Sequence, residues 1–241
     1  MEYVSYNGIQ IPYQVVKSNR KTISIRINYE GVIVHAPKRL SNAKIAELIQ
    51  KKAHWICEKH KELSVAKSQM PKIDYSEGSQ FLFRGRELTL RLYQDSKRGR
   101  KKTEGNVWME EDELGVACED HSPEVIKGLL EEWYRQAARL RFESRVHYYT
   151  MNYDFGKEVN RISIKDQKSR WGSCSTKCNL NFNYRLIMAP DEVLDYVVVH
   201  ELCHLKQMNH SKEFWEAVEQ IQPEYNQYRE WLRKNGNTLR V

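Results

Sequence analysis

Residues 196–210 read YVVVHELCHLKQMNH. His200 and His204 are four positions apart, so on a helix their side chains share one face, about 6 Å apart along the axis. Two imidazoles in this arrangement can bind one metal ion. Glu201 lies beside that face, where a carboxylate can contact a metal-bound water without itself being a ligand. The spacing therefore predicts a helical metal site.

His210 is the expected third ligand. It follows His204 after five residues, which is enough for the helix to end and the chain to turn back. Asn209 is the residue we expect to end the helix, because asparagine tolerates the left-handed conformation. If the helix instead continued past Gln207, His210 would lie about 600° around from His204 and could not bind. Glu213 would then be the alternative third ligand.

The segments around these residues favour a buried helix beside a strand. We expect a helix over residues 190–207, because residues 196–199 are apolar on every side. Residues 180–187 alternate apolar and polar side chains, which predicts a strand with one buried face. As an edge strand it could lie along a cleft and pair with an extended peptide.

Upstream, the pattern predicts an α+β protein. Alternating strands fill residues 1–37, and Ser41 is expected to cap a helix that ends near residue 63. Further strands are expected at 79–83, 87–93, 106–109 and 114–118, and no internal repeat is evident. Ser122-Pro123 is a good helix start, so a long helix is predicted from there to about residue 149. We therefore divide the chain into a β-rich N-terminal part with one helix (1–120) and a C-terminal metal-binding unit (121–241).

Composition limits the class of protein. Hydrophobic residues make up 40% of the chain, which excludes wholesale disorder. We see no signal-peptide-like start and no apolar run long enough to span a membrane. The five cysteines cannot all pair, which favours reduced thiols and a cytoplasmic location.

The chain is basic, with a formal net charge of +7. One dense basic run falls between two predicted strands: Lys97-Arg98-Gly99-Arg100-Lys101-Lys102. Such a run can attract nucleic acid. It contains no aromatic residue on which bases could stack, so a solvated hairpin tip is the simpler interpretation.

Four stretches of the C-terminal part form one recognisable pattern: RWGSCS at 170–175, the strand at 180–187, YVVVHELCHL at 196–205, and NHS with FW at 209–215. They resemble the YgjP-like metallopeptidase family, which is related to Wss/SprT-type proteases and grouped with the zincins. The resemblance is specific over about residues 160–222 and looser in the N-terminal part. It implies a zincin-like catalytic unit with zinc held by His200, His204 and His210. Cys203 stands where we would expect a small residue such as alanine.

Together, residues and resemblance predict a zinc-dependent hydrolase of polypeptides in which Glu201 takes a proton from the attacking water. Arg170, or a backbone amide at 172–173, could stabilise the oxyanion. The alternative for this segment is structural, with Trp171 in the core and Gly172 in a turn. Two other functions stay open: a metal-dependent nucleotide or phosphoanhydride hydrolase, and a nucleic-acid-bound module with secondary protease activity.

Overall fold

A computed structural model describes residues 2–28, 31–69, 73–94, 105–167 and 170–241 of the chain. It divides into two compact units, Met1–Lys72 and Ile73–Val241. None of the helices in these ranges is long and apolar enough to cross a membrane.

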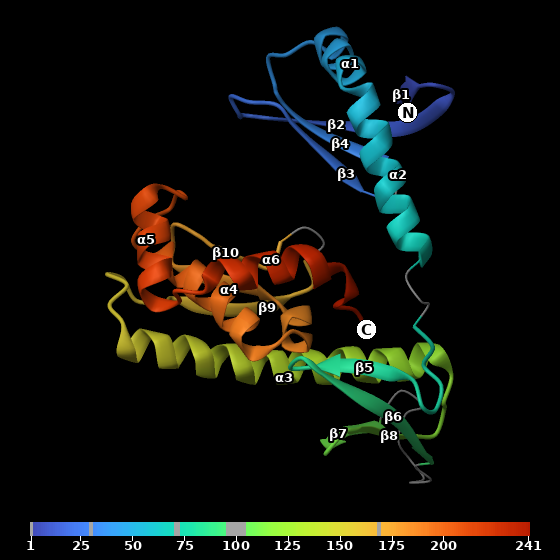
Figure 1. Cartoon of the computed structure of the whole chain (residues 1–241), viewed down its shortest axis with the longest axis vertical. Coiled ribbons are helices and arrows are strands. Elements are labelled where there is room, and N and C mark those ends of the chain that lie inside the picture. Colours follow the sequence, from blue (N-terminus) through green and yellow to red (C-terminus); the bar gives the residue numbers. More distant parts are fainter. Residues whose placement is uncertain (1, 29–30, 70–72, 95–104, 168–169) are drawn as a thin grey trace. The chain divides into compact units, whose positions relative to one another are not determined.

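The first unit is a four-stranded sheet followed by helices (Figure 1). The sheet has the order β1-β2-β4-β3, with β2 and β4 parallel: β1 (Glu2–Tyr6), β2 (Ile9–Ser18), β3 (Ser24–Asn28) and β4 (Gly31–Pro37). Ser41 caps the first helix as predicted, because its hydroxyl accepts a hydrogen bond from the Lys44 amide at 3.3 Å. The single predicted helix is broken at Lys52 into α1 (Asn42–Lys51) and α2 (Ala53–Gln69).

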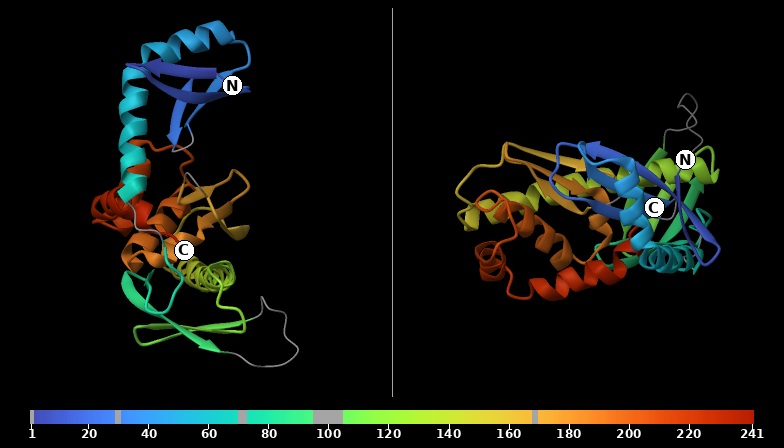
Figure 2. Two further views of the ribbon diagram at one scale, coloured as in Figure 1. Left: turned by 90° about the vertical axis from the view of Figure 1, so that its right-hand side faces the viewer. Right: turned by 90° about the horizontal axis from the view of Figure 1, so that it is seen from above.

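The second unit begins with another four-stranded sheet. Its order is β5-β6-β8-β7, with β6 and β8 parallel: β5 (Gln80–Phe83), β6 (Arg86–Gln94), β7 (Gly105–Glu110) and β8 (Glu113–Cys118). The long helix α3 (Pro123–Asn152) follows, close to its predicted bounds. In the left view of Figure 2, α3 is seen end-on, with this sheet on one side and the orange and red helices on the other.

The two sheets repeat one arrangement of strands and helix. Each begins with an antiparallel hairpin, and the tips match, with φ angles of 47° and 80° at Asn7-Gly8 and of 51° and 78° at Arg84-Gly85. Corresponding core positions are buried in both units, in the pairs Val4 and Phe81, Ile11 and Leu88, Tyr13 and Leu90, Val32 and Leu114, and Ile45 and Ile126. The side chains differ in four of these five pairs, so the repeat is not evident in the sequence.

The division after Lys72 differs from the boundary at residue 120 that the sequence suggested. The sheet β5–β8 shares one hydrophobic core with α3, in which Leu90 and Leu114 join Ile126 and Leu130. The predicted boundary after residue 120 therefore marks a switch from strand to helix within one core.

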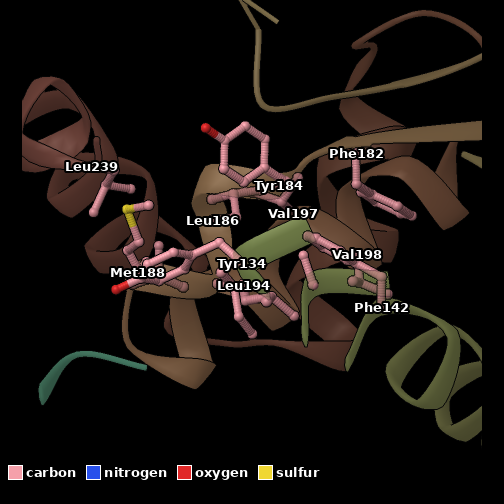
Figure 3. Packing of buried hydrophobic residues seen from close by; sticks show 14 of the residues in the cluster. Tyr134, Phe142, Phe182, Tyr184, Leu186, Met188, Leu194, Val197, Val198 and Leu239 are labelled. Atoms are coloured by element: carbon pink, nitrogen blue, oxygen red, sulfur yellow. The ribbon is translucent and has the colours of Figure 1, made fainter. Parts of the chain in front are cut away.

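Beyond α3 the chain forms the part that contains the histidines. It has a three-stranded sheet in the order β10-β11-β9 and further helical segments: β9 (Arg161–Lys165), β10 (Gly172–Cys174), β11 (Asn179–Asn183), η1 (Tyr184–Met188), α4 (Asp191–Cys203), α5 (Lys212–Ile221), α6 (Tyr225–Asn235) and η2 (Gly236–Thr238). The rings of Phe142 on α3 and Phe182 on β11 stack with centroids 4.4 Å apart. Figure 3 shows these rings beside Val198 of α4, so α3 supports both the sheet and the helix.

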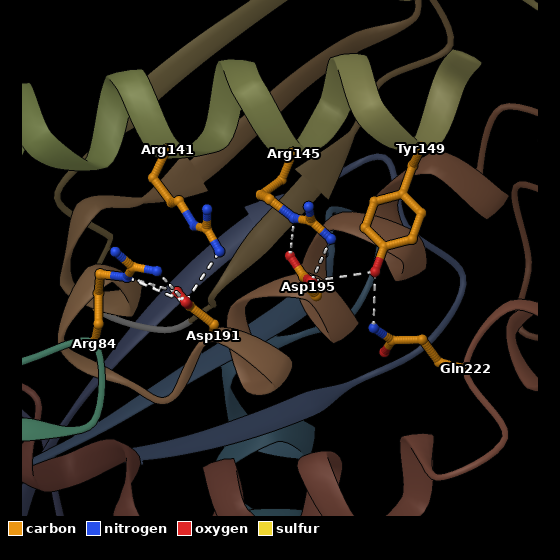
Figure 4. Close-up of polar contacts among 7 residues, drawn as sticks. All are labelled: Arg84, Arg141, Arg145, Tyr149, Asp191, Asp195 and Gln222. Carbon is orange, nitrogen blue, oxygen red and sulfur yellow. Dashed lines mark hydrogen bonds and ion pairs between the residues drawn. The ribbon is translucent and has the colours of Figure 1, made fainter. Parts of the chain in front are cut away.

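Two carboxylates on α4 attach it to α3 (Figure 4). Arg145 donates to both oxygens of Asp195 at 2.7 Å, and the Tyr149 hydroxyl donates to the same carboxylate at 3.2 Å. One turn earlier, Arg141 lies 3.0 Å from Asp191, and Arg84 at the β5–β6 hairpin also pairs with that carboxylate. Because these charged groups are spaced one turn apart on both helices, they set the register of α4 along α3.

Candidate metal centre

The three predicted histidines converge. The ligand nitrogens of His200, His204 and His210 all lie within 4.8 Å of one another, and in the described ranges this is the group whose arrangement suits a metal ion. His200 Nε2 and His210 Nε2 are 3.1 Å apart. Tetrahedral zinc, with Zn–N distances of about 2.1 Å, holds its nitrogens about 3.4 Å apart. The three nitrogens are therefore close enough together to share one ion.

The chain reaches His210 by an earlier turn than expected. Helix α4 ends at Cys203, and the amides of Lys206 and Gln207 both donate to the Cys203 carbonyl, at 3.1 and 3.0 Å. The expectation of a left-handed Asn209 was wrong, because its φ is not among the positive values. Its side-chain oxygen instead accepts from the Ser211 amide at 3.3 Å, which shapes the loop before α5.

Hydrogen bonding and stacking orient two of the rings. His204 Nδ1 lies 2.8 Å from the Gln207 carbonyl, so this nitrogen donates and Nε2 keeps its lone pair for a metal. Phe214 stacks on His204 at 4.5 Å, and Trp215 stacks on His210 at 5.7 Å. Both aromatic residues lie in the first turn of α5, which begins two residues after His210 and so holds their rings beside the histidines.

Burial favours the neutral form of His200 and His210. It is the main reason that the pKa of His200 falls to about 3, and the charges of His204, His210 and Arg229 lower it further. The pKa of His210 is lowered for the same leading reason. Neutral imidazole is the form that binds a metal, so these two rings are ready to bind near neutral pH.

Glu201 is buried beside this group, with 5% of its surface exposed. Burial raises the pKa of its carboxyl to about 8, against the opposing effects of the Arg170 charge and a hydrogen bond from the Cys174 amide. Its Oε2 atom has no protein hydrogen-bond partner in the described ranges. A buried carboxyl with a free oxygen and a pKa near neutrality can exchange protons with a bound molecule.

Strand β10 covers Glu201. Gly172 does not form a turn but lies in this strand, where an added Cβ would be 2.5 Å from Glu201 Oε1. A glycine inside a strand often marks such a close approach, and this signal was available in the sequence.

The predicted strand at 180–187 needs correction. β11 ends at Asn183, and the next five residues form the 3-10 turn η1. β11 also lies between β10 and β9, so it is the central strand. The edge beside Glu201 belongs to β10 instead.

Arg170 is exposed, and its charge acts on Glu201. Trp171 is partly buried against the core, as its structural interpretation predicts. Cys174 and Cys178 are free thiols and are partly buried. The basic run at residues 97–102 lies outside the described residues.

A cleft of about 320 Å³ opens beside Glu201. His200 and Glu201 line it together with Trp171, Tyr196 and residues of α6 that include Arg229 and Leu232. The contribution of α6 was not foreseen, because nothing in the local pattern of residues 224–234 connects them to the histidines.

Comparison with known proteins agrees with this geometry. No curated protein matches the chain. The model of the family described as YgjP-like, metallopeptidase domain, matches residues 21–235. That range includes the three histidines, Glu201 and α6. The chain therefore belongs to the YgjP-like family of metallopeptidase domains and is a metal-dependent hydrolase.

Proposed function

We propose that the protein is a zinc-dependent peptidase in which His200, His204 and His210 hold the metal and Glu201 moves the proton. The observation that carries this proposal is the convergence of three imidazoles beside one buried carboxyl. Three nitrogen ligands also leave a position open for a reactant, as in catalytic rather than structural zinc sites.

The protein's own groups would share the work as follows. Zinc, when bound, supplies a Lewis acid that makes water a nucleophile near neutral pH. Glu201 accepts the proton of the attacking water at Oε2 and donates it to the leaving amine. Arg170 supplies positive charge near the reacting carbonyl and helps to stabilise the negative charge that forms on its oxygen.

Strand β10 favours a peptide substrate over a nucleotide. In the described residues it pairs with β11 on one side, and on its other edge the Cys174 amide donates to Glu201. An extended peptide can add to such an edge through backbone hydrogen bonds, which would bring its carbonyls past Glu201. The free thiols of Cys57, Cys174, Cys178 and Cys203 support a reducing compartment such as the cytoplasm.

The test compares two substrate classes. Purified zinc-loaded protein is incubated with denatured casein and, separately, with nucleoside triphosphates. We expect new peptide termini by mass spectrometry, their loss on chelation, and their return when zinc is added. Release of phosphate without peptide cleavage would overturn the proposal in favour of a phosphoanhydride hydrolase.

A further inference from the structure

Arg229 is a cation without a carboxylate partner beside the cleft. Its guanidinium carbon lies 5.2 Å from the ring centre of Trp215, and no ion pair or hydrogen bond engages it in the described ranges. Arg233, one turn further along α6, also lines the cleft but donates to both oxygens of Glu230, at 2.7 and 2.6 Å. Arg229 is therefore free to bind an anion.

The position of the cleft beside Glu201 indicates which part of a substrate would enter it. Glu201 lines the cleft, and in the proposed reaction this carboxyl must reach the leaving amine. The residue that carries this amine therefore lies nearest to the cleft. Tyr196, Val197 and Leu232 supply apolar surface, so the cleft suits an apolar stem that ends in a negative charge.

We propose that this cleft receives the residue on the leaving side of the cleaved bond and that Arg229 selects a carboxylate there. The proposal rests on the peptidase function above. The guanidinium can form paired, charge-assisted hydrogen bonds to a carboxylate, which an uncharged amide of the same shape cannot match. The carboxylate has two possible sources: an Asp or Glu side chain, or the free C-terminus of the substrate.

The experiment uses matched peptides. A cleavage site found in the casein digest is rebuilt as peptides with Glu or Gln after the cleaved bond. A second pair ends one residue after that bond, with a free or an amidated C-terminus. Cleavage is measured for the full-length wild type, Arg229→Gln, and Lys234→Gln, which removes a charge from α6 outside the cleft. Binding of the same peptides to Glu201→Gln and to the double variant Glu201→Gln/Arg229→Gln is measured by calorimetry.

We expect the wild type and Lys234→Gln to prefer the carboxylate peptide of one pair by at least ~10-fold, the ratio that one charge-assisted hydrogen bond provides. Arg229→Gln should cleave both members of that pair equally, and the preference in binding should disappear in the double variant. The peptide pair that shows the preference identifies the source of the carboxylate, either a side chain or the C-terminus.

Equal cleavage of both members of each pair by the wild type would overturn this inference and leave the peptidase function standing. An equal loss on both members in Arg229→Gln would also overturn it, since Arg229 would then act by holding Trp215 against His210. Absence of any peptide cleavage by the zinc-loaded wild type would instead refute the proposed function.

Discussion

Glu201 has an environment that serves proton transfer more than metal binding. Its carboxyl is buried against the backbone of β10, and one oxygen lacks a protein partner in the described part of the chain. A ligand oxygen would be expected to belong to the group formed by the three histidines, which does not include Glu201.

Glu201→Gln should therefore separate catalysis from metal binding. The amide keeps the shape of the side chain but cannot accept the proton, so we expect turnover of casein to fall at least ~100-fold with zinc content unchanged. Activity and metal analysis on the same preparation check this. Loss of zinc from the variant would make Glu201 a ligand and refute its role as base.

The same substitution should change the pH dependence of stability in zinc-free protein. The pKa of Glu201 is about 8 in the folded chain, against 4.5 as its ordinary value. Between these values the folded chain holds one proton that the unfolded chain has lost, so stability falls as pH rises through this window. Glu201→Gln removes that loss. Denaturant titrations should show the variant gaining on the wild type from pH 5 to pH 8, and an equal difference at both pH values would contradict the assignment.

His210 and Glu213 provide a test of the third ligand. His210 lies 3.1 Å from His200, whereas Glu213 is exposed on the first turn of α5 and outside the histidine group. We expect His210→Ala to lose on the order of several kcal/mol of zinc binding. Glu213→Ala is the control and should change zinc affinity little. Competition titration with a zinc chelator measures both, and the reverse order of effects would exclude His210.

Among the elements, α3 fixes the position of α4, the helix that carries His200 and Glu201. The side chains of Arg145 and Asp195 are 19% and 12% exposed, so their bidentate ion pair is largely shielded from water. Asp191, one turn earlier on α4, is already engaged by Arg84 and Arg141 (Figure 4) and does not pair with Arg145.

Asp195→Asn should consequently destabilise the fold by about 2–3 kcal/mol, below the full cost of breaking a completely buried pair because both groups keep some contact with water. Urea titration measures the change. Glu230→Gln, which breaks the exposed pair with Arg233 on α6, is the matched control and should have little effect. If the two variants were equally destabilised, the Arg145–Asp195 pair would not be what holds α4.

In the whole molecule, the two units have separate hydrophobic cores. Val34 and Ile49 belong to the core of Met1–Lys72, and Leu114 and Val198 to that of Ile73–Val241. All three histidines and Glu201 lie in the second unit. The repeated sheet-and-helix arrangement means that each unit has its own helix to cover its own sheet.

A fragment of residues 73–241 should therefore fold and bind zinc without the first unit. We expect a cooperative unfolding transition by circular dichroism and a zinc affinity close to that of the full chain. A fragment that is unfolded, or that binds zinc only when residues 1–72 are added, would show that the second unit depends on the first.

The sequence alone determined the local part of the site. Helical periodicity places His200, Glu201 and His204 on one helix, and the spacing after His204, with the family resemblance, predicted His210. The structure brings the three histidines together. The sequence also predicted the strands of the second sheet and the long helix, because alternation and capping are properties of neighbouring residues.

Only the tertiary structure decided which distant segments meet there. Gly172 covers Glu201, and Arg229 reaches the cleft from α6, because the core packs β10 and α6 around α4. The repeat and the division after Lys72 were also beyond reach of the sequence. Each core position accepts several apolar side chains of suitable volume, so two similar units can be built from sequences with little in common.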